Sequence, residues 1–342
     1  MLTVATILDP FSEQCFAPEW TTVPLRSDDY ISRITKTKNI AFLFAESVWR
    51  GPGNTWSHYF VQNKKNPVPA GMRQLTRLMK ECKARKIPTV FWAKEDPVHF
   101  KHFVTVAGLF DYVATTDVNC VNNYKKALGH ARVFVLPFAA QMSLHNPVGL
   151  ADRPLNVCFA GTCRNNQYPN RAKAMEVVVQ PAIGFGLHIY DRKQAGASGE
   201  PFPSIYKAAI KGGLPYNAIV QKYKEYKVFL NINSIDNSPT MFSRRVFELL
   251  GCGTPVISSP SVGITSMLPE VLISNTAQET VQHLKKLLSD DTYWKRVSAA
   301  GIRRIFESHT YTHRLKTICD IIKVQLPKDT IDRLAKAKEF IL

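Results

Sequence analysis

The sequence predicts an α/β protein with two Rossmann-like domains and a helical tail. Short apolar runs alternate with longer amphipathic stretches, a polar and proline-bearing stretch interrupts this pattern at 141–154, and only helix-like segments follow Thr276. Strands that alternate with helices form parallel sheets with right-handed crossovers. The length of 342 residues also fits two domains of about 150 residues each. We therefore expect an N-terminal domain over 1–145, a C-terminal domain over 154–320 and a tail over 321–342.

The expected strands fall into two sets, one in each half of the chain. They are short apolar runs bounded by turn-forming residues, as is typical of buried parallel strands. In the first half they are Leu2–Leu8, Asn39–Ala45, Pro88–Trp92, Asp111–Ala114 and Arg132–Leu136. In the second half they are Leu155–Ala160, Leu187–Tyr190, Val228–Ile232, Pro255–Ser258 and Val271–Ser274.

The composition is that of a soluble globular protein with an excess of positive charge. Hydrophobic residues make up 45% and charged residues 21% of the chain, and the net charge is +17. No apolar run approaches the roughly 20 residues of a membrane span, and no signal peptide is evident, so we expect a cytoplasmic location. The charge favours anionic partners: a nucleotide donor, an anionic membrane surface at the inner face, an anionic polymer or nucleic acid.

The cysteines and histidines do not form a metal-binding pattern. The seven cysteines are scattered without a Cys-x-x-Cys pair, which indicates reduced and mostly buried side chains. His99 and His102 are three residues apart on an expected helix, but no further ligand cluster accompanies them. We expect no metal site.

The most informative segment is 236–259, DNSPTMFSRRVFELLGCGTPVISS. Ser238 suits an N-cap and Pro239 the first turn of a helix that ends about three turns later at Gly251. Arg244, Arg245 and Glu248 would then lie within one turn of each other.

This trio matches the chemistry of a nucleoside diphosphate. Two guanidiniums suit a diphosphate, and a neighbouring carboxylate can accept hydrogen bonds from both ribose hydroxyls. The helix follows an apolar strand, so its start lies at the sheet edge where open α/β folds bind ligands. The alternative is that Arg244 and Glu248 form an ordinary surface ion pair.

A second strand-to-helix junction offers further donor contacts. Gly161 permits close backbone approach after the strand, and a polar loop then leads to a helix expected near Pro169, with Arg171 in its first turn. A plain turn is the alternative. The predicted donor-binding residues in the two junctions are Gly161, Thr162, Arg164, Tyr168, Asn233, Ser238, Thr240, Arg244, Arg245 and Glu248.

Polar groups at the ends of two strands in the N-terminal half are candidates for catalysis. Glu95, Asp96 and His99 follow one strand, and Glu46 ends another, so each can act as the base toward an acceptor hydroxyl. Asp96, before Pro97, alternatively caps the next helix.

The loop after Glu46 combines glycines with two indoles, which suits a sugar or lipid acceptor held against aromatic faces. The predicted acceptor-binding residues are Trp49, Gly51, Gly53, Asn54 and Trp56. The alternative is an exposed loop with its tryptophans packed on the core.

The stretch 71–86, GMRQLTRLMKECKARK, has one apolar stripe among basic residues. It suits peripheral contact with an anionic membrane. The alternative, which we favour, is a Rossmann-domain helix whose apolar stripe faces its own sheet.

Five segments resemble those of CgeB-type, or spore-maturation-protein-B-like, glycosyltransferases of the GT-B fold. They are FWAKEDPVHFKHF, FDYVATTD, RVFVLPFAAQ, YKVFLNINS and RRVFELLGCGTPVIS, and the resemblance extends to about residue 320. It implies two facing Rossmann-like domains, with a nucleotide-sugar donor bound by the C-terminal one and an acceptor by the N-terminal one. It further implies nucleobase recognition at 211–218, including Gly213 and Leu214, where a Gly-Gly turn before a helix is the alternative.

One position departs from the family pattern. Many GT-B enzymes carry two glutamates eight positions apart, the first near the transferred sugar and the second on the ribose. Glu248 fits the second, but Thr240 occupies the position of the first. The resemblance therefore carries over a ribose contact at Glu248 but no retaining mechanism.

Together these features predict a glycosyltransferase that uses a nucleoside diphosphate sugar, with a UDP-sugar favoured. The acceptor would be a hydroxyl of a glycan, a lipid or an anionic polymer. No cofactor is expected to be obligatory, because arginines and helix dipoles can hold the diphosphate. The alternatives are a nucleotide-sugar epimerase of the same fold, a DNA-directed sugar transferase and a nucleic-acid-binding protein.

Overall fold

A computed structural model describes all residues except 150–152, 164–167, 195, 197–198 and 342. The chain divides into two compact units, one formed by Met1–Phe138 with Tyr311–Ala335, and the other by Ala139–Thr310 with Lys336–Leu342. The boundary after Phe138 precedes the interrupted stretch at 141–154, and helices after Tyr311 return to the first unit.

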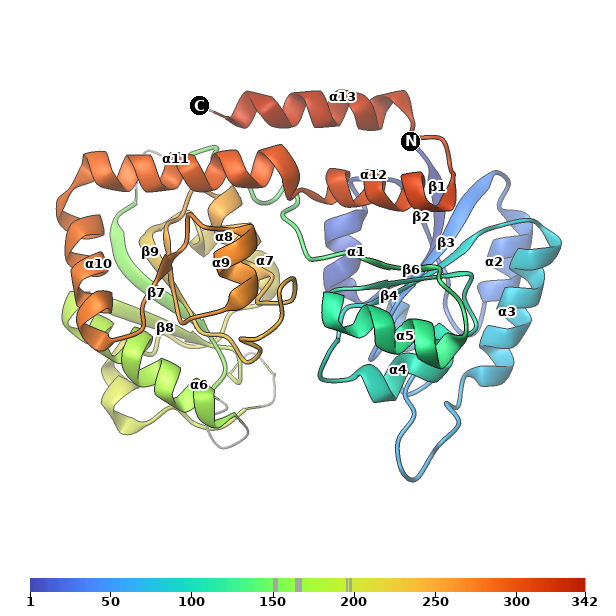
Figure 1. The fold of residues 1–342 in the computed structure, drawn as a ribbon, viewed down its shortest axis with the longest axis horizontal. Helices are drawn as coiled ribbons and strands as arrows, with labels where there is room; N and C mark the ends of the chain where they lie inside the picture. The colour runs from blue at the N-terminus through green and yellow to red at the C-terminus, as the bar shows by residue number, and fades with distance from the viewer. Residues whose placement is uncertain (150–152, 164–167, 195, 197–198, 342) are drawn as a thin grey trace. The chain divides into compact units, whose positions relative to one another are not determined.

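The first unit holds a six-stranded sheet in the order β2-β1-β3-β4-β5-β6, with every neighbouring pair parallel (Figure 1). Its elements are β1 (Thr3–Ile7), α1 (Pro10–Phe16), β2 (Thr21–Pro24), α2 (Tyr30–Lys36), β3 (Ile40–Glu46), η1 (Pro52–Asn54), α3 (Met72–Ala84), β4 (Thr89–Ala93), α4 (Phe100–Ala107), β5 (Tyr112–Thr115), η2 (Val118–Cys120), α5 (Val121–Leu128), β6 (Val133–Val135), α12 (Tyr311–Ile322) and most of α13 (Lys328–Ala337).

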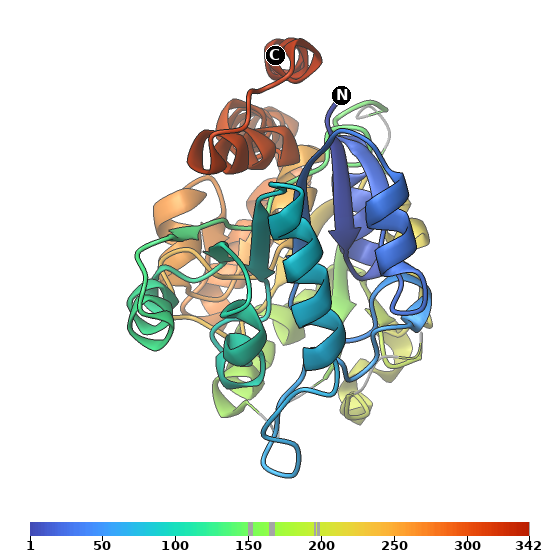
Figure 2. The ribbon, with the colours of Figure 1, turned by 90° about the vertical axis from the view of Figure 1, so that its right-hand side faces the viewer.

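Alternate residues of β3 pack on opposite faces of this sheet. Leu43 and Ala45 join the core that α2, α3, α4 and α5 cover. On the other face Phe44 contacts Phe16 of α1 at a ring-centroid distance of 5.0 Å, and Phe16 contacts Tyr311 of α12 at 4.7 Å. Figure 2 shows α3 lying over the sheet. The sheet is thus covered by helices on both faces, as parallel sheets require.

The second unit holds a five-stranded parallel sheet in the order β11-β10-β9-β7-β8. Its elements are β7 (Leu155–Gly161), α6 (Pro169–Ala174), the π-helical turn η3 (Met175–Val179), η4 (Gln180–Phe185), β8 (Leu187–Asp191), η5 (Ser204–Ala209), α7 (Tyr216–Lys222), β9 (Tyr226–Asn231), α8 (Arg245–Gly251), β10 (Val256–Ser258), α9 (Val262–Met267), β11 (Leu272–Ile273), α10 (Ala277–Ser289), α11 (Asp291–Ser308) and η6 (Lys338–Phe340).

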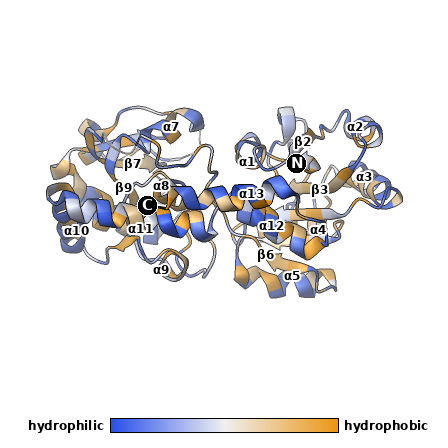
Figure 3. Ribbon diagram, turned by 90° about the horizontal axis from the view of Figure 1, so that it is seen from above, coloured by the Kyte–Doolittle hydropathy of each residue, from blue (hydrophilic) through white to orange (hydrophobic). Residues whose placement is uncertain are grey.

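One face of the second sheet is covered by η3, η4, α10 and α11, whose apolar side chains pack on Val157, Val228 and Ile257. Figure 3 shows that α10 and α11 carry both polar and apolar residues, as amphipathic helices do. Both units therefore have the Rossmann-like design predicted from the alternating pattern.

All ten predicted strands are present, and the structure adds one that the pattern missed. β2, with the sequence TTVP, is four residues long and lies at the edge of its sheet. A short edge strand ending in proline lacks the apolar run that identifies a buried strand.

The helix predicted from Ser238 is shorter than expected, because α8 begins only at Arg245. Ser238 does cap a turn, since its Oγ accepts from the backbone N–H of Thr240 at 3.3 Å and of Met241 at 2.9 Å. The following residues leave the helical path, and Phe242 stacks on Phe247 at 4.9 Å. Tertiary packing thus overrides the local helix signal.

The seven cysteines are all free and buried, as predicted. The helix α3 packs its apolar stripe against its own sheet, with Leu75, Leu78 and Cys82 in the core. The structure thus corrects the membrane-surface interpretation of 71–86, because that stripe is not available to a lipid surface. In the described part of the chain, no helix combines the length and apolarity that a bilayer span needs.

Candidate active site

In each sheet there is a switch point, where successive connections between strands leave in opposite directions along the sheet. Predicted site residues lie at these two switch points. In the second unit β8 lies on one side of β7 and β9 on the other, so the loops after β7 and β9 diverge at the carboxyl edge. In the first unit the same holds for the loops after β1 and β3. Such switch points are where open α/β sheets bind ligands.

Arg244 and Glu248 at the second switch point form a close pair. The Arg244 Nε lies 3.6 Å from Glu248 Oε1, and the exposed fractions of the two side chains are 30% and 2%. Glu248 also accepts hydrogen bonds from Tyr216 Oη at 3.2 Å and from Tyr223 Oη at 3.0 Å. The helical spacing correctly predicts the proximity of Arg244 and Glu248, but it does not predict the contacts of Glu248 with the two tyrosines.

Arg245 points elsewhere. Its guanidinium donates to the Ala160 carbonyl at the end of β7 and, through Nε, to Tyr223 Oη at 3.3 Å. It therefore links α8 to β7 and Tyr223. The two arginines thus have different partners, and of the two only Arg244 pairs with Glu248. The contact of both with a diphosphate stays a prediction.

A buried histidine completes this cluster. His145 Nε2 lies 2.9 Å from Tyr216 Oη, and His145 Nδ1 accepts the Gln141 backbone N–H at 3.0 Å. Burial lowers the pKa of His145 to about 4, an effect that the Glu248 carboxylate partly opposes. His145 lies in the predicted linker, where no sequence signal separates it from an ordinary loop histidine.

The loop after β7 is held by Arg171 of α6. Its guanidinium donates to the carbonyls of Thr162 at 3.0 Å and Ile232 at 3.2 Å, and to Ser234 Oγ at 3.3 Å. Arg171 thus ties together the loops after β7 and β9. Gly161 ends β7, where an added Cβ would lie 2.9 Å from the Phe159 ring. Arg164 lies outside the described residues.

The remaining donor candidates occupy the same edge. Asn233 is buried and bonds to the β10 end, with its Nδ2 3.1 Å from the Ser259 carbonyl. Tyr168 is the N-cap of α6, and Thr162 is buried. Gly213 and Leu214 lie between Gly212, whose φ is +92°, and the start of α7 at Tyr216.

In the first unit three charged side chains meet at the switch point. Lys94 Nζ lies 2.9 Å from Asp9 Oδ2 and 2.8 Å from Glu46 Oε1, and Glu46 is fully buried. Burial would lower the pKa of Lys94, but the carboxylates of Glu46 and Asp9 outweigh it and raise this pKa. Glu46, predicted as a candidate base, is therefore part of a buried ion cluster.

Asp9 also organises the loop predicted to bind the acceptor. Its carboxylate accepts the backbone N–H groups of Trp49 at 3.3 Å, Arg50 at 3.1 Å and Gly51 at 2.8 Å. Asp9 and Lys94 were not predicted as site residues, although Asp9 directly follows a predicted strand and Lys94 lies two residues after another.

The two indoles of this loop have different surroundings. Trp56 is fully buried, and its Nε1 donates to the Leu25 carbonyl at 2.7 Å. This corrects its assignment to the acceptor site, because no ring face is available. Trp49 is 37% exposed. Gly51, Gly53 and Asn54 all have positive φ and form the tight bend around η1.

The other catalytic candidates follow the strand β4. Asp96 is buried and accepts from Thr115 Oγ1 at 2.6 Å and Tyr124 Oη at 3.3 Å. Burial raises its pKa to about 7. The residue neither caps α4, whose N-cap is His99, nor faces solvent, so both predicted roles of Asp96 are corrected.

Glu95 and His99 are partly exposed. His99 Nδ1 lies 3.1 Å from His102 Nδ1, and the Trp49 ring lies edge-on to His99 at 5.1 Å. The aromatic surface of Trp49 and the imidazole of His99 thus lie side by side at the carboxyl edge of β3 and β4. Sequence spacing alone placed the two histidines together, but it did not place Trp49 beside them.

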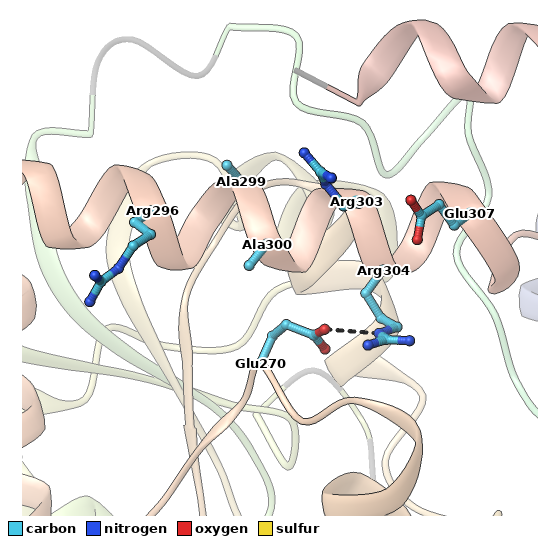
Figure 4. Close-up of a pocket in the computed structure, with 7 residues that line it drawn as sticks. All are labelled: Glu270, Arg296, Ala299, Ala300, Arg303, Arg304 and Glu307. Atoms are coloured by element: carbon cyan, nitrogen blue, oxygen red, sulfur yellow. Dashed lines mark hydrogen bonds and ion pairs between the residues drawn. The ribbon is translucent and has the colours of Figure 1, made fainter.

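A separate pocket of about 320 Å³ lies on α11 (Figure 4). Arg304 reaches from this helix to Glu270, at 2.9 Å, whereas Arg303 points away from that pair. The lining residues are Glu270, Arg296, Ala299, Ala300, Arg303, Arg304 and Glu307. None of them belongs to the predicted sites.

Comparison with known proteins agrees with this architecture. Residues 177–320 match a family model described as "Glycosyl transferase-like". A glycosyltransferase from Rickettsia africae ESF-5 is similar in structure, with a TM-score of 0.56, 11% identity, and coverage of 95% of this chain and 99% of that one. HepE of Anabaena, solved in complex with UDP and glucose, has a TM-score of 0.55, 11% identity, and coverage of 94% and 92%.

An α,α-trehalose 6-phosphate synthase from Burkholderia multivorans is similar over 94% of this chain and 98% of its own, with a TM-score of 0.53 and 11% identity. At such identities the likeness establishes the fold. No curated protein sequence matches the chain. The fold and the match over 177–320 lead to one conclusion: this chain is a glycosyltransferase of the GT-B fold.

Proposed function

We propose that the enzyme transfers a sugar from a nucleoside diphosphate sugar, with UDP-glucose as the favoured donor, to an acceptor hydroxyl. The observation that carries the proposal is the Arg244–Glu248 pair at the switch point of the second sheet. A guanidinium beside a carboxylate suits the diphosphate and the ribose of one ligand. One structurally similar protein also supports a uridine donor, because HepE of Anabaena was solved both with UDP and glucose and with UDP-glucose.

The acceptor, in this proposal, binds at the first sheet's switch point. Trp49 offers the aromatic face for a sugar ring, and the partly exposed Glu95 and His99 are the candidate bases for the acceptor hydroxyl. The net charge of +17 favours an acceptor on an anionic glycan, lipid or polymer. The resemblance to CgeB-type enzymes is in keeping with such a reaction.

We further propose that the donor binds without an obligatory metal or other cofactor. Arg244 carries a permanent positive charge that can offset the charge of the leaving diphosphate. The affinity for UDP, measured by calorimetric titration, should therefore be the same with and without EDTA. A loss of binding in EDTA that Mg²⁺ or Mn²⁺ restores would contradict this part.

Calorimetric titration of the full chain with UDP, ADP and GDP tests the donor site. UDP should bind, and Arg244→Ala or Glu248→Ala should weaken it roughly tenfold to a hundredfold, because each removes a charge-assisted contact of about 1.5–3 kcal/mol. Arg303→Ala is the matched control, since Arg303 is an exposed arginine of the same unit outside the site. Absence of nucleotide binding by the wild type, or unchanged affinity in both site variants, would remove the support for this function.

A further inference from the structure

The hydroxyl of Tyr216 lies between two groups that it joins. Tyr216 Oη is 2.9 Å from His145 Nε2 and 3.2 Å from Glu248 Oε1. Tyr216 begins α7, and Glu248 lies on α8, so the hydroxyl connects two helices at one sheet edge. Tyr216 lies within the predicted nucleobase segment 211–218, but no predicted role joins Tyr216 or His145 to Glu248.

The backbone determines the direction of these hydrogen bonds. The Gln141 N–H points at His145 Nδ1 at 3.0 Å, so Nδ1 is the acceptor and the proton of the neutral ring sits on Nε2. Nε2–H then donates to Tyr216 Oη, and the proton of Tyr216 is directed to Glu248. Because burial lowers the pKa of His145 to about 4, the ring is neutral at physiological pH.

The ring of Tyr216 contacts the second partner of the pair. The Arg244 guanidinium carbon lies 5.7 Å from the Tyr216 ring centroid, within the range of a cation–π contact. Tyr216 therefore touches both Arg244 and Glu248, one with its face and the other with its hydroxyl. Tyr223 holds the second carboxylate oxygen of Glu248 at 3.0 Å.

We propose that Tyr216, oriented by His145, is a positioning residue that sets Glu248 for the ribose diol and Arg244 for the diphosphate of a ribonucleoside diphosphate. This inference rests on the proposed function. Glu248 is only 2% exposed, so the ribose reaches it when Arg244 gives up the 3.6 Å ion pair and turns to the diphosphate. The shorter bonds from Tyr216 and Tyr223 keep the carboxylate in place during that exchange.

The test is the preference for UDP over 2′-deoxy-UDP, measured as the ratio of the two dissociation constants. The wild type should prefer UDP about tenfold, the effect of one good hydrogen bond to a charged group. Tyr216→Phe keeps the ring but removes the hydroxyl, so the ratio should fall to within about twofold. Tyr206→Phe is the control, because it removes a buried hydroxyl of the same unit that contacts Met175 and not Glu248.

A second pair of variants carries the test if Tyr216→Phe does not fold. The amide of His145→Gln can accept from Gln141 and donate to Tyr216, so this variant should keep the UDP preference. His145→Leu can do neither and should lose it.

Three results would count against these ideas, and they can be told apart. A wild type that binds neither nucleotide overturns the proposed function itself. A wild type that binds both equally shows that no ribose contact exists, and a Tyr216→Phe variant that weakens both nucleotides with an unchanged ratio shows a structural role only. Either of the latter overturns the positioning role.

Discussion

Two aspartates of the first unit show how the surroundings of one residue decide its charge. Burial raises the pKa of both carboxyl groups, but the neighbouring Lys94 and the backbone N–H groups of Gly51 and Arg50 bring the pKa of Asp9 below its ordinary value. Asp96 has hydroxyl partners instead, and burial raises its pKa to about 7. Asp9 is thus a fixed anion in the acceptor loop, whereas Asp96 titrates near neutrality.

Asp96 should make the protein less stable as the pH rises. Its pKa is about 7 in the folded protein and 3.8 without the fold, so the folded state holds a proton that the unfolded state has lost between these values. The contribution of Asp96 to the free energy of unfolding is complete below pH 3.8. Above that pH it falls by up to about 1.4 kcal/mol per pH unit, until the pH passes the pKa of Asp96 in the folded protein.

Asp96→Asn should remove that fall and be more stable than the wild type at pH 8. Urea unfolding at pH 5 and pH 8 measures both effects. Equal pH dependence of the two proteins would show that Asp96 does not titrate in this range.

At the residue scale, sequence reasoning found Arg244 and Glu248 but not their surroundings. Four positions on a helix place two side chains together whatever the tertiary structure. Tyr216 is 32 positions from Glu248, and His145 is 71 positions from Tyr216, so only folding brings them together. Arg245 lies three positions from Glu248, which also makes the two neighbours on a helix, and its contact with the Ala160 carbonyl could not be foreseen.

At the scale of elements, the ends of β1, β3 and β4 are joined by the ion cluster of Asp9, Glu46 and Lys94. Removal of the one cation would leave two carboxylates facing each other in a buried place. Lys94→Ala should therefore lower the free energy of unfolding by about 3–5 kcal/mol.

The control for this prediction is Lys316→Ala in the same unit. Lys316 and Asp320 form a 2.6 Å pair, but their side chains are 50% and 57% exposed, so the cost should be at most about 1 kcal/mol. Chemical denaturation followed by circular dichroism compares the two variants. Similar small losses in both would mean that the cluster does not hold the strand ends together.

The acceptor loop depends on Gly51. Its φ is +67°, and an added Cβ would lie 2.8 Å from the Trp56 ring. Gly129 has nearly the same φ, +68°, but no atom within 4 Å of an added Cβ. Gly129→Ala should thus lower the free energy of unfolding by the left-handed backbone strain alone, roughly 1–2 kcal/mol. Gly51→Ala should lower it clearly more, because the methyl group also meets the Trp56 ring. The changes in melting temperature of the two variants test this prediction. Equal changes would show that the Trp56 ring moves to accommodate the methyl group.

The elements themselves were largely predictable. Buried parallel strands have an apolar pattern that depends on local sequence, and all ten predicted strands are present. The exceptions are the elements that depend on distant contacts. β2 is defined by its pairing with β1, and the start of α8 is delayed to Arg245 although Ser238 and Pro239 are typical of a helix start.

At the scale of the whole molecule, the chain returns to its first unit after Thr310 and rejoins the second unit from Lys336. The predicted tail began at 321, whereas the return begins at Tyr311, where α12 packs on the first sheet. Amphipathic helices show from the sequence that they cover something, but not which unit they cover. The positive charge is likewise spread over the chain and does not identify a partner.

The reaction class can be separated from epimerisation with the whole enzyme. UDP-glucose incubated without an acceptor should keep its sugar and undergo at most slow hydrolysis, because transfer needs a second substrate. Proton NMR of the anomeric region follows both processes. Accumulation of an epimeric nucleotide sugar would contradict the transferase and favour the alternative enzyme.

The central claim is that the switch point of the second sheet, with Arg244 and Glu248, holds a nucleoside diphosphate. A crystal structure of the full chain with UDP tests it most directly. We predict the ribose within hydrogen-bonding distance of Glu248 and the diphosphate beside Arg244. An ordered nucleotide bound away from both residues would contradict the account.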